Sequence, residues 1–277
     1  MLFFDEMFAA PLGTGSAGNC HFVESGQTRI LVDAGFGPRQ VDKRLRSIGR
    51  SLESIDAIVL THEHHDHIRG ADKISRKYGI PVYGTRGTLD RSRFDETAVR
   101  VRPFVNNRPF RIGDLEIHPR RVTHDAADPA CFVIESTGGA RLGIATDLGW
   151  VDRPVRDHLS GCDTLFFEAN HDLDMLRDGT YPWVLKRRIM SNVGHLSNDE
   201  SFRTLLEIAD ERLHSIVLIH LSQKNNHETI VRGMANDLLE TTGAPIEIRI
   251  SKQEQAETLI DVARCHNSAK GQLRLFG

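Results

Sequence analysis

Residues 61–67, THEHHDH, follow directly on the apolar run IDAIVL at residues 55–60. An apolar run of this length that ends in polar residues is typical of a buried strand. Side chains just beyond such a strand are held in place by the core and still reach solvent, so this is a natural position for a functional site. The pattern therefore predicts a strand over residues 55–61 and a site in the loop after it.

The side chains of this loop are ligands for divalent metal ions, because imidazole nitrogen and carboxylate oxygen bind zinc, iron and manganese. His62 and His64 are two residues apart and can face one ion in an extended segment. Asp66 and His67 fall on the next turn and can face a second ion. A solvated polar loop is the alternative, but imidazoles this close together serve no structural purpose that polar spacers would not serve better. We therefore predict that this loop supplies part of the ligand set of each of two metal ions.

Three further candidates stand at the ends of other predicted strands. His124, Asp147 and His220 each follow a short strand-like run. Taken singly, each histidine could be satisfied by hydrogen bonds and the aspartate could cap a turn. Their shared position at strand ends, like that of the first cluster, favours a common site.

Length and periodicity indicate one large α/β domain. The chain of 277 residues is close to the upper size of a single domain, and it has neither an internal repeat nor a long linker. Short strand-like runs joined by turns occupy the start and the middle of the chain, and helix and strand patterns follow each group. This order would suit two packed sheets with helices outside. The expected helices include residues 38–49, 70–78, 199–211 and 228–241.

Composition excludes several classes of protein. Contents of 39% hydrophobic and 26% charged residues exclude disorder, collagen and coiled coil. The formal net charge of −3 gives no global basic field, so nucleic-acid binding would need a local patch or bound cations. Neither a signal sequence nor an apolar run of roughly 20 residues is evident. We expect a cytoplasmic protein without a membrane or an obligate protein partner. Its four widely spaced cysteines predict reduced thiols.

The pattern H-x-H-x-D-H at residues 62–67 resembles the signature of the metallo-β-lactamase superfamily, and the later candidates fit its motifs in the expected order over nearly the whole chain. The resemblance implies an αββα sandwich, in which two mixed β-sheets pack face to face with helices on both outer faces. It also implies two metal ions at one edge of the sheets. The implied ligands are His62, His64 and His124 for the first ion, Asp66, His67 and His220 for the second, and Asp147 as a bridge.

Other segments resemble a narrower branch, the YycJ (WalJ) exonucleases, which is associated with 5′ to 3′ digestion of DNA. These segments are LGTGSAGN at 12–19, THDAADP at 123–129, EANHD at 168–172 and YPWVLKRR at 181–188. His195 follows Asp147 too closely for the inserted β-CASP domain of ribonuclease J. We therefore expect a single metallo-β-lactamase-fold domain over residues 1–277 without that insertion.

A second cluster predicts phosphate binding. The segment SNVGHLSN at residues 191–198 precedes a predicted helix, whose N-terminus can bind an anion through free N–H groups, and a basic run lies at residues 186–188. The order resembles the Gly-His motif before the last metal histidine in nucleases such as ribonuclease J. A solvated helix face for the basic run and a packing or capping role for the histidine are the alternatives. The predicted substrate-binding residues are His195, Ser197, Asn198, Lys186 and Arg187.

Together these patterns predict a dinuclear metal-dependent hydrolase. Two divalent ions, with zinc expected first and manganese or iron as alternatives, can hold a bridging hydroxide and neutralise charge on a phosphoryl oxygen. Asp66 and Asp147 would orient the hydroxide, and His195 would steady the phosphate or assist the leaving group. DNA is the predicted substrate. A thioester or lactone hydrolase, a small-phosphodiester hydrolase and a metal-stabilised binding module are the alternatives.

Overall fold

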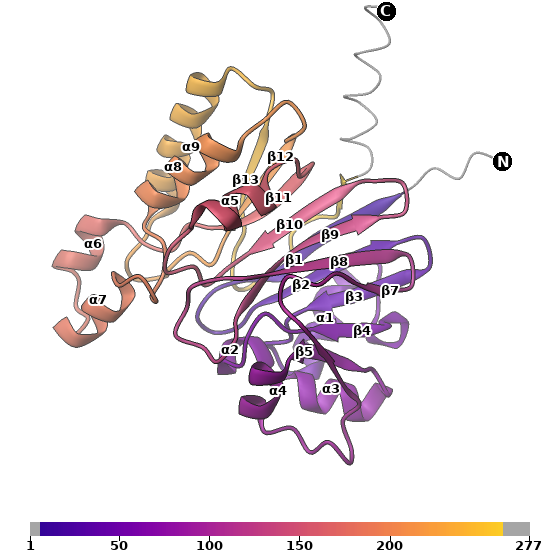
Figure 1. Ribbon diagram of the computed structural model, residues 1–277. Helices are drawn as coiled ribbons and strands as arrows, with labels where there is room; N and C mark the ends of the chain where they lie inside the picture. Colours follow the sequence, from indigo (N-terminus) through magenta and orange to yellow (C-terminus); the bar gives the residue numbers. More distant parts are fainter. Residues whose placement is uncertain (1–5, 263–277) are drawn as a thin grey trace, which may run out of the picture.

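The structure, a computed structural model, describes residues 6–262 and contains two mixed β-sheets of seven strands each within that range (Figure 1). In pairing order, the first sheet consists of β14 (Ile260–Asp261), β1 (Met7–Gly13), β2 (Cys20–Ser25), β3 (Thr28–Val32), β4 (Ala57–Val59), β5 (Val82–Thr85) and β6 (Val101–Phe104). The second consists of β13 (Glu247–Ile250), β12 (Ser215–Ile219), β11 (Thr164–Glu168), β10 (Arg141–Ala145), β9 (Ala130–Ser136), β8 (Leu115–Arg121) and β7 (Phe110–Ile112).

Each sheet joins an antiparallel half to a parallel half. β1, β2 and β3 pair antiparallel, whereas β3, β4, β5 and β6 pair parallel. The second sheet repeats this plan, with β7 to β10 antiparallel and β10 to β13 parallel. Parallel strands with both faces covered are apolar throughout, and β4 and β12 are indeed buried at every position. The short apolar runs of the sequence are therefore the central strands of the sheets.

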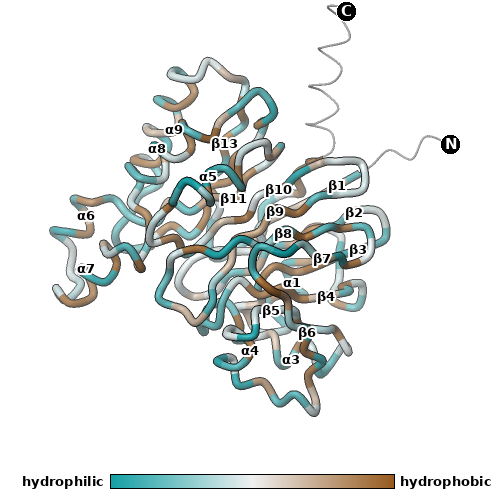
Figure 2. The backbone as a smooth tube through the Cα atoms, in the orientation of Figure 1, coloured by the Kyte–Doolittle hydropathy of each residue, from teal (hydrophilic) through white to brown (hydrophobic). Residues whose placement is uncertain are grey.

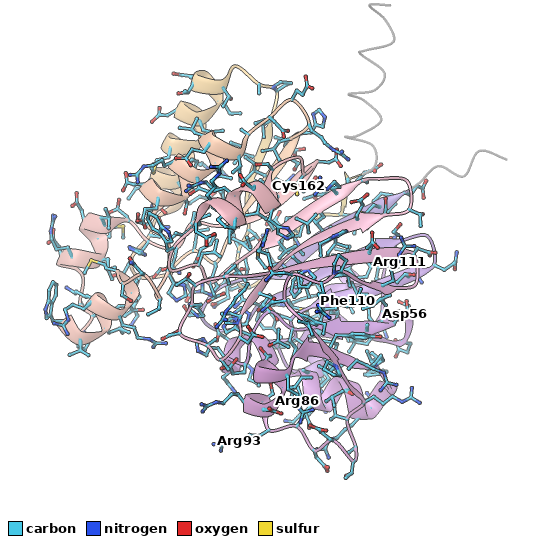
Figure 3. The ribbon with its side chains drawn as sticks, in the orientation of Figure 1. Asp56, Arg86, Arg93, Phe110, Arg111 and Cys162 are labelled. Atoms are coloured by element: carbon cyan, nitrogen blue, oxygen red, sulfur yellow. The ribbon has the colours of Figure 1, made fainter. Side chains whose placement is uncertain are left out.

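The inner faces of the two sheets form one core. Val23 and Ile30 of the first sheet belong to the same buried cluster as Phe132 and Phe166 of the second. At the margin, Phe110 on β7, which is labelled in Figure 3, marks the outer strand of the second sheet. Its ring stacks on that of Phe104 of β6, with ring centroids 5.0 Å apart. Because β6 and β7 are the outermost strands of different sheets, this aromatic pair closes one side of the sandwich.

Helices cover both outer faces (Figure 1). The face of the first sheet packs against α1 (Pro38–Ser47) and α3 (Ala71–Tyr78), and α4 (Arg86–Ser92) contacts β5 and β6. The face of the second sheet packs against α5 (Arg153–Leu159), α8 (Asn198–Ile208) and α9 (Glu228–Thr242). The remaining helices among the described residues are η1 (Leu52–Ser54), α2 (His65–Ile68), α6 (Leu173–Asp178) and α7 (Trp183–Ile189). This architecture confirms the predicted αββα sandwich.

Three of the four cysteines are described, and they match the expectation of reduced thiols. Cys20, Cys131 and Cys162 are free and buried, and burial raises the pKa of Cys162 to about 12, so this thiol stays protonated (Figure 3). Cys265 lies outside the described residues. Across residues 6–262, no helix combines the length and apolar character that crossing a bilayer requires.

Candidate metal centre

The predicted ligands meet at one edge of the sandwich because each follows the end of a strand. The loop after β4 carries His62 and leads into α2, while Asp147 follows β10 and His220 follows β12. Within the second sheet, the carboxyl ends of the parallel strands β10, β11 and β12 meet at the same edge, which brings Asp147 and His220 together, while the loop after β4 reaches this edge from the first sheet. Asp147 (φ 57°) and His220 (φ 58°) both adopt the left-handed backbone conformation, which turns the chain sharply after the strand.

Three imidazoles form the first group. His62, His64 and His124 offer nitrogen atoms that lie within 4.8 Å of one another. His124 Nε2 lies 3.3 Å from His64 Nδ1. His62 is buried and its Nε2 has no hydrogen-bond partner among the described residues. Burial, reinforced by the nearby charge of His67, holds the pKa of His62 well below its usual range, so its imidazole is neutral, which is the form that binds metal.

Asp66, His67 and His220 form the second group, again within 4.8 Å of one another. Asp66 Oδ2 lies 3.6 Å from His67 Nε2 and 3.8 Å from His220 Nε2. His220 Nε2, like His62 Nε2, is buried and has no hydrogen-bond partner among the described residues. Each of the two groups thus contains an unused imidazole nitrogen where a metal ligand is predicted.

Asp147 lies between the two groups. Its Oδ2 is 3.2 Å from His67 Nε2, and its Oδ1 is 3.7 Å from His220 Nε2 and 3.8 Å from His124 Nε2. Burial alone would raise the pKa of Asp147, but the charges of His220 and His67 outweigh it and hold that pKa well below its usual range. A buried carboxylate of this kind demands positive charge beside it, and a divalent cation supplies that charge as well as a proton does.

The donor set fits divalent ions of the zinc, manganese and iron type. The seven side chains supply five imidazoles and two carboxylates, which are the ligand types these ions accept. The hydrogen bonds point to the same conclusion. Buried polar atoms normally have a hydrogen-bond partner, and the Nε2 atoms of His62 and His220 have none among the described residues. The structure therefore brings all seven predicted ligands into an arrangement that can hold metal.

Carboxylates behind the ligands fix the orientation of the rings. Asp33 Oδ2 lies 2.7 Å from His67 Nδ1, and Thr61 donates to Asp33 through both its backbone N–H and its hydroxyl, each at 2.8 Å. An Nδ1–H that donates to Asp33 leaves the Nε2 lone pair of His67 directed at the site. Asp33 also adopts a left-handed backbone, with φ 62°.

Glu168, the last residue of β11, plays the corresponding part on the other side of the centre. Its buried Oε1 lies 2.7 Å from His195 Nδ1 and 3.4 Å from His220 Nδ1, and its Oε2 accepts the backbone N–H of Leu148 at 2.6 Å. Reasoning from the sequence gave Glu168 no role. The sequence feature that could have identified Glu168 is its position at the end of the strand TLFFE, where a carboxylate follows three apolar residues.

The glycine-rich segment 12–19 supports the centre and does not merely form a turn. Thr14 Oγ1 accepts the backbone N–H of His220 at 3.0 Å. Asn19 Nδ2 lies 3.0 Å from His67 Nε2 and 3.4 Å from Asp66 Oδ2. This segment therefore ties the first strand to ligands that lie far away in the sequence.

The predicted phosphate-binding residues separate into two groups. His195 reaches the centre, with Nδ1 3.7 Å from Asp147 Oδ1 and its ring stacked on that of His220 at 5.1 Å between centroids. Ser197 instead caps α8 by accepting the N–H of Glu200 at 3.2 Å. Asn198 is buried and donates to Asn226 at 3.0 Å.

The basic run before this segment also differs from the expectation. Lys186 is buried and donates to the carbonyl oxygen of Arg177 at 2.6 Å, so its ammonium is turned away from the centre. Arg187 is exposed and is absent from the cavity beside the centre. Arg188, the last residue of the basic run but not one of the predicted substrate-binding residues, reaches the site, because it donates to Asp125 Oδ2 at 2.6 Å.

A cavity of about 250 Å³ opens beside the seven side chains. The residues around it come from the histidine groups, the segment before α8, the glycine-rich segment and α7. They include Ser16, His124, Tyr181, Arg188, His195 and Ser222. A substrate that enters this cavity would meet His124, one of the seven predicted ligands, together with His195 and the guanidinium of Arg188.

Known proteins resemble this chain in sequence and in structure. A family model described as a beta-lactamase superfamily domain matches residues 28–221. Exodeoxyribonuclease YycJ of Bacillus anthracis is 32% identical over 238 residues, which are 84% of this chain and 89% of that protein. Exodeoxyribonuclease WalJ of Streptococcus pneumoniae serotype 2 (strain D39) is 34% identical over 236 residues, 81% of this chain and 87% of that protein.

Among solved structures, the metallo-beta-lactamase fold protein YhfI of Bacillus subtilis superposes with a TM-score of 0.69 at 20% identity. The match covers 91% of this chain and 99% of YhfI, and it supports the same sandwich. The sequence match, the fold and the H-x-H-x-D-H loop agree. The chain therefore belongs to the metallo-β-lactamase superfamily of metal-dependent hydrolases.

Proposed function

We propose that this protein is a dinuclear metal-dependent phosphodiesterase that digests DNA in the cytoplasm as a 5′ to 3′ exonuclease. The observation that carries the proposal is the meeting of seven metal-binding side chains beside a cavity that also holds His195 and Arg188. The names of the two relatives, both exodeoxyribonucleases, support DNA as the substrate. In this proposal residues 1–277 act as one domain without an inserted β-CASP domain.

The two groups of the centre would each hold one ion, and Asp147 would contact both. His62, His64 and His124 would hold the first ion. Asp66, His67 and His220 would hold the second. When bound, two such ions supply an activated water at neutral pH and neutralise charge on a phosphoryl oxygen.

The protein side chains around the cavity would bind and orient the phosphodiester. His195 donates or accepts through Nε2, because its Nδ1 faces Glu168 at 2.7 Å, so its free edge is available to a phosphoryl oxygen or to the leaving group. Arg188 would contact a neighbouring phosphate as a planar cation. Its present partner, Asp125, keeps the guanidinium at the cavity wall.

Metal analysis followed by digestion of 5′-phosphorylated DNA tests the proposal. His64→Ala and Asp147→Ala should lose metal and hydrolysis while keeping the folded circular dichroism spectrum, because each removes a predicted ligand. His65→Ala is the matched control, since His65 follows His64 directly as the first residue of α2 but is exposed. Hydrolysis at full rate by both ligand variants would disprove the scheme. Cleavage of a thioester but not of DNA by the wild-type protein would instead favour the carbonyl alternative.

A further inference from the structure

A short helical segment beside the cavity carries an unusual amount of exposed apolar surface. Residues 173–190, which we call the α6–α7 arm, lie at one edge of the molecule away from the two sheets (Figure 1). Four of the eight large hydrophobic side chains that are exposed among the described residues belong to it: Leu173, Trp183, Val184 and Met190. Trp183 is 59% exposed and Val184 is 77% exposed. Such a concentration of apolar surface indicates a binding surface.

The arm is continuous with the metal centre. Tyr181, Leu185 and Arg188 line the same cavity as His124 and His195. Residues four apart share one face of a helix, so Val184 lies beside Arg188, and Trp183 lies beside Arg187, about 6 Å along the axis. A ligand that leaves the cavity along α7 therefore meets these exposed side chains next.

The end of α7 is held firmly against the centre. The backbone N–H of His195 donates to the carbonyl oxygen of Ile189 at 2.9 Å. A Cβ at Gly194 would collide with the carbonyl oxygens of Arg188 and Ile189, so only glycine permits this approach. The position of the arm relative to His195 is thus fixed by the backbone.

Positive charge accompanies the apolar surface. Apolar and charged residues follow one another in short blocks along α7, brown and teal in Figure 2. Arg187 is exposed and forms no ion pair with any residue between 6 and 262. Lys224 lies over the ring of Tyr181, 5.4 Å from its centroid. The two acidic residues of α6, by contrast, are paired with Arg177. Because Arg188 is already paired with Asp125 and Lys186 is buried, Arg187 supplies the exposed and unpaired positive charge of the arm among the described residues.

We propose that the α6–α7 arm holds the unpaired strand of a nucleic-acid substrate, with a base stacked on Trp183 and its phosphates beside Arg187 and Arg188. Aromatic rings next to cations along a path are what single-strand binding requires, since bases stack on the rings and phosphates contact the charges. A purely apolar partner would leave the cations unused. This inference rests on the proposed function, because it extends the path of the DNA from the metal centre.

The tryptophans make a direct binding experiment possible. The chain has two, Trp150 and Trp183, so Trp150→Phe leaves Trp183 as the sole tryptophan. The probe is a thymidine oligonucleotide with nuclease-resistant phosphorothioate linkages, added to the full-length, metal-loaded protein. We expect the probe to quench the fluorescence of Trp183. In the otherwise unaltered protein, Trp183→Ala should weaken binding about 5-fold to 150-fold, the range for loss of one stacked base. Leu206→Ala, which alters an exposed apolar residue of α8, is the control and should bind like wild type.

Two results would overturn the inference. One is unchanged fluorescence of Trp183 at saturating oligonucleotide, or equal affinity of Trp183→Ala and wild type. The other is self-association that depends on Trp183 in sedimentation, which would assign the surface to a second copy of the chain. Digestion of DNA is measured separately on the wild-type protein. If quenching occurs without any hydrolysis, the arm binds the strand and the proposed nuclease activity fails.

Discussion

At the scale of single residues, the centre depends on carboxylates that do not themselves belong to the predicted ligand set. Asp33 and Glu168 are fully buried, and each lies 2.7 Å from the Nδ1 of a histidine. Outer carboxylates of this kind select the tautomer of the ring and hold it in position. The precision of the site therefore comes from two strand-end acids as much as from the histidines.

Glu168→Gln tests this dependence. The substitution keeps the shape of the side chain but removes the charge that faces His195 and His220. We expect turnover on DNA to fall about 10-fold to 100-fold, the usual effect of losing such a partner, with the fold unchanged. Turnover, metal content and circular dichroism are measured together.

Glu211→Gln serves as its control, because Glu211 is exposed on the loop after α8. Because the charge on Glu168 would influence proton transfer through His195, the pH profile of turnover should also change in the Glu168 variant. Equal rates and equal pH profiles for wild type and Glu168→Gln would contradict an orienting role.

At the scale of elements, the sequence predicts what is apolar and local but misses what depends on contacts in space. The expected helix 70–78 corresponds to α3 and the helix 228–241 to α9, because both carry clear apolar periodicity and end at a glycine. The polar stretch before residue 198 contains α6 and α7, which were not predicted. The face of α7 includes exposed Trp183 and Val184, so no buried stripe marks the helix.

The same reasoning applies to the candidate site. The ligands could be predicted because each follows a strand and four of them lie within six residues. Asp33, at a strand end, could be suggested as a supporting residue, but Glu168 could not, since it meets His195 only when β11 and the segment before α8 converge. Lys186 was assigned to phosphate from its charge, whereas the fold buries it against Arg177. Charge alone does not predict where a side chain points.

Ser197 allows a test at this scale. The sequence predicts that its hydroxyl binds phosphate, whereas in the structure the hydroxyl caps α8. Loss of the N-cap oxygen in Ser197→Ala should lower the free energy of unfolding by about 0.5–2 kcal/mol. Ser197→Gly is the matched control, because glycine at an N-cap lowers the free energy of unfolding by only roughly a few tenths of a kcal/mol. Urea unfolding measures the difference. A raised KM for DNA at unchanged stability would show that the hydroxyl acts on substrate instead.

At the scale of the whole molecule, the predicted ligands come from both sheets. The loop after β4 belongs to the first sheet, whereas His124, Asp147 and His220 follow strands of the second. A metal ion that contacts both sets would join the two layers at this edge, as Phe104 and Phe110 join them at the margin. Metal binding should therefore stabilise the sandwich as well as complete the active site.

Chelation tests this coupling. At a free zinc concentration about 100-fold above its Kd, binding to the folded state adds about 2.7 kcal/mol per site. For a chain of this size we expect the Tm to rise by several degrees on addition of zinc and to fall again with a chelator, as measured by differential scanning calorimetry. Asp147→Ala should show a much smaller shift. An identical Tm with and without metal would rule out the coupling.

The left-handed backbone at Asp33, Asp147 and His220 has a consequence for how this enzyme can vary. Aspartate, asparagine and histidine tolerate that conformation better than other residues with a Cβ, and β-branched residues tolerate it least. The left-handed turn and the role of these side chains in the centre therefore restrict the same three positions to nearly the same few amino acids. In a library randomised at these positions, folded but inactive variants should carry chiefly asparagine or glycine. Variants with valine or isoleucine should be absent even when the library is selected only for soluble expression.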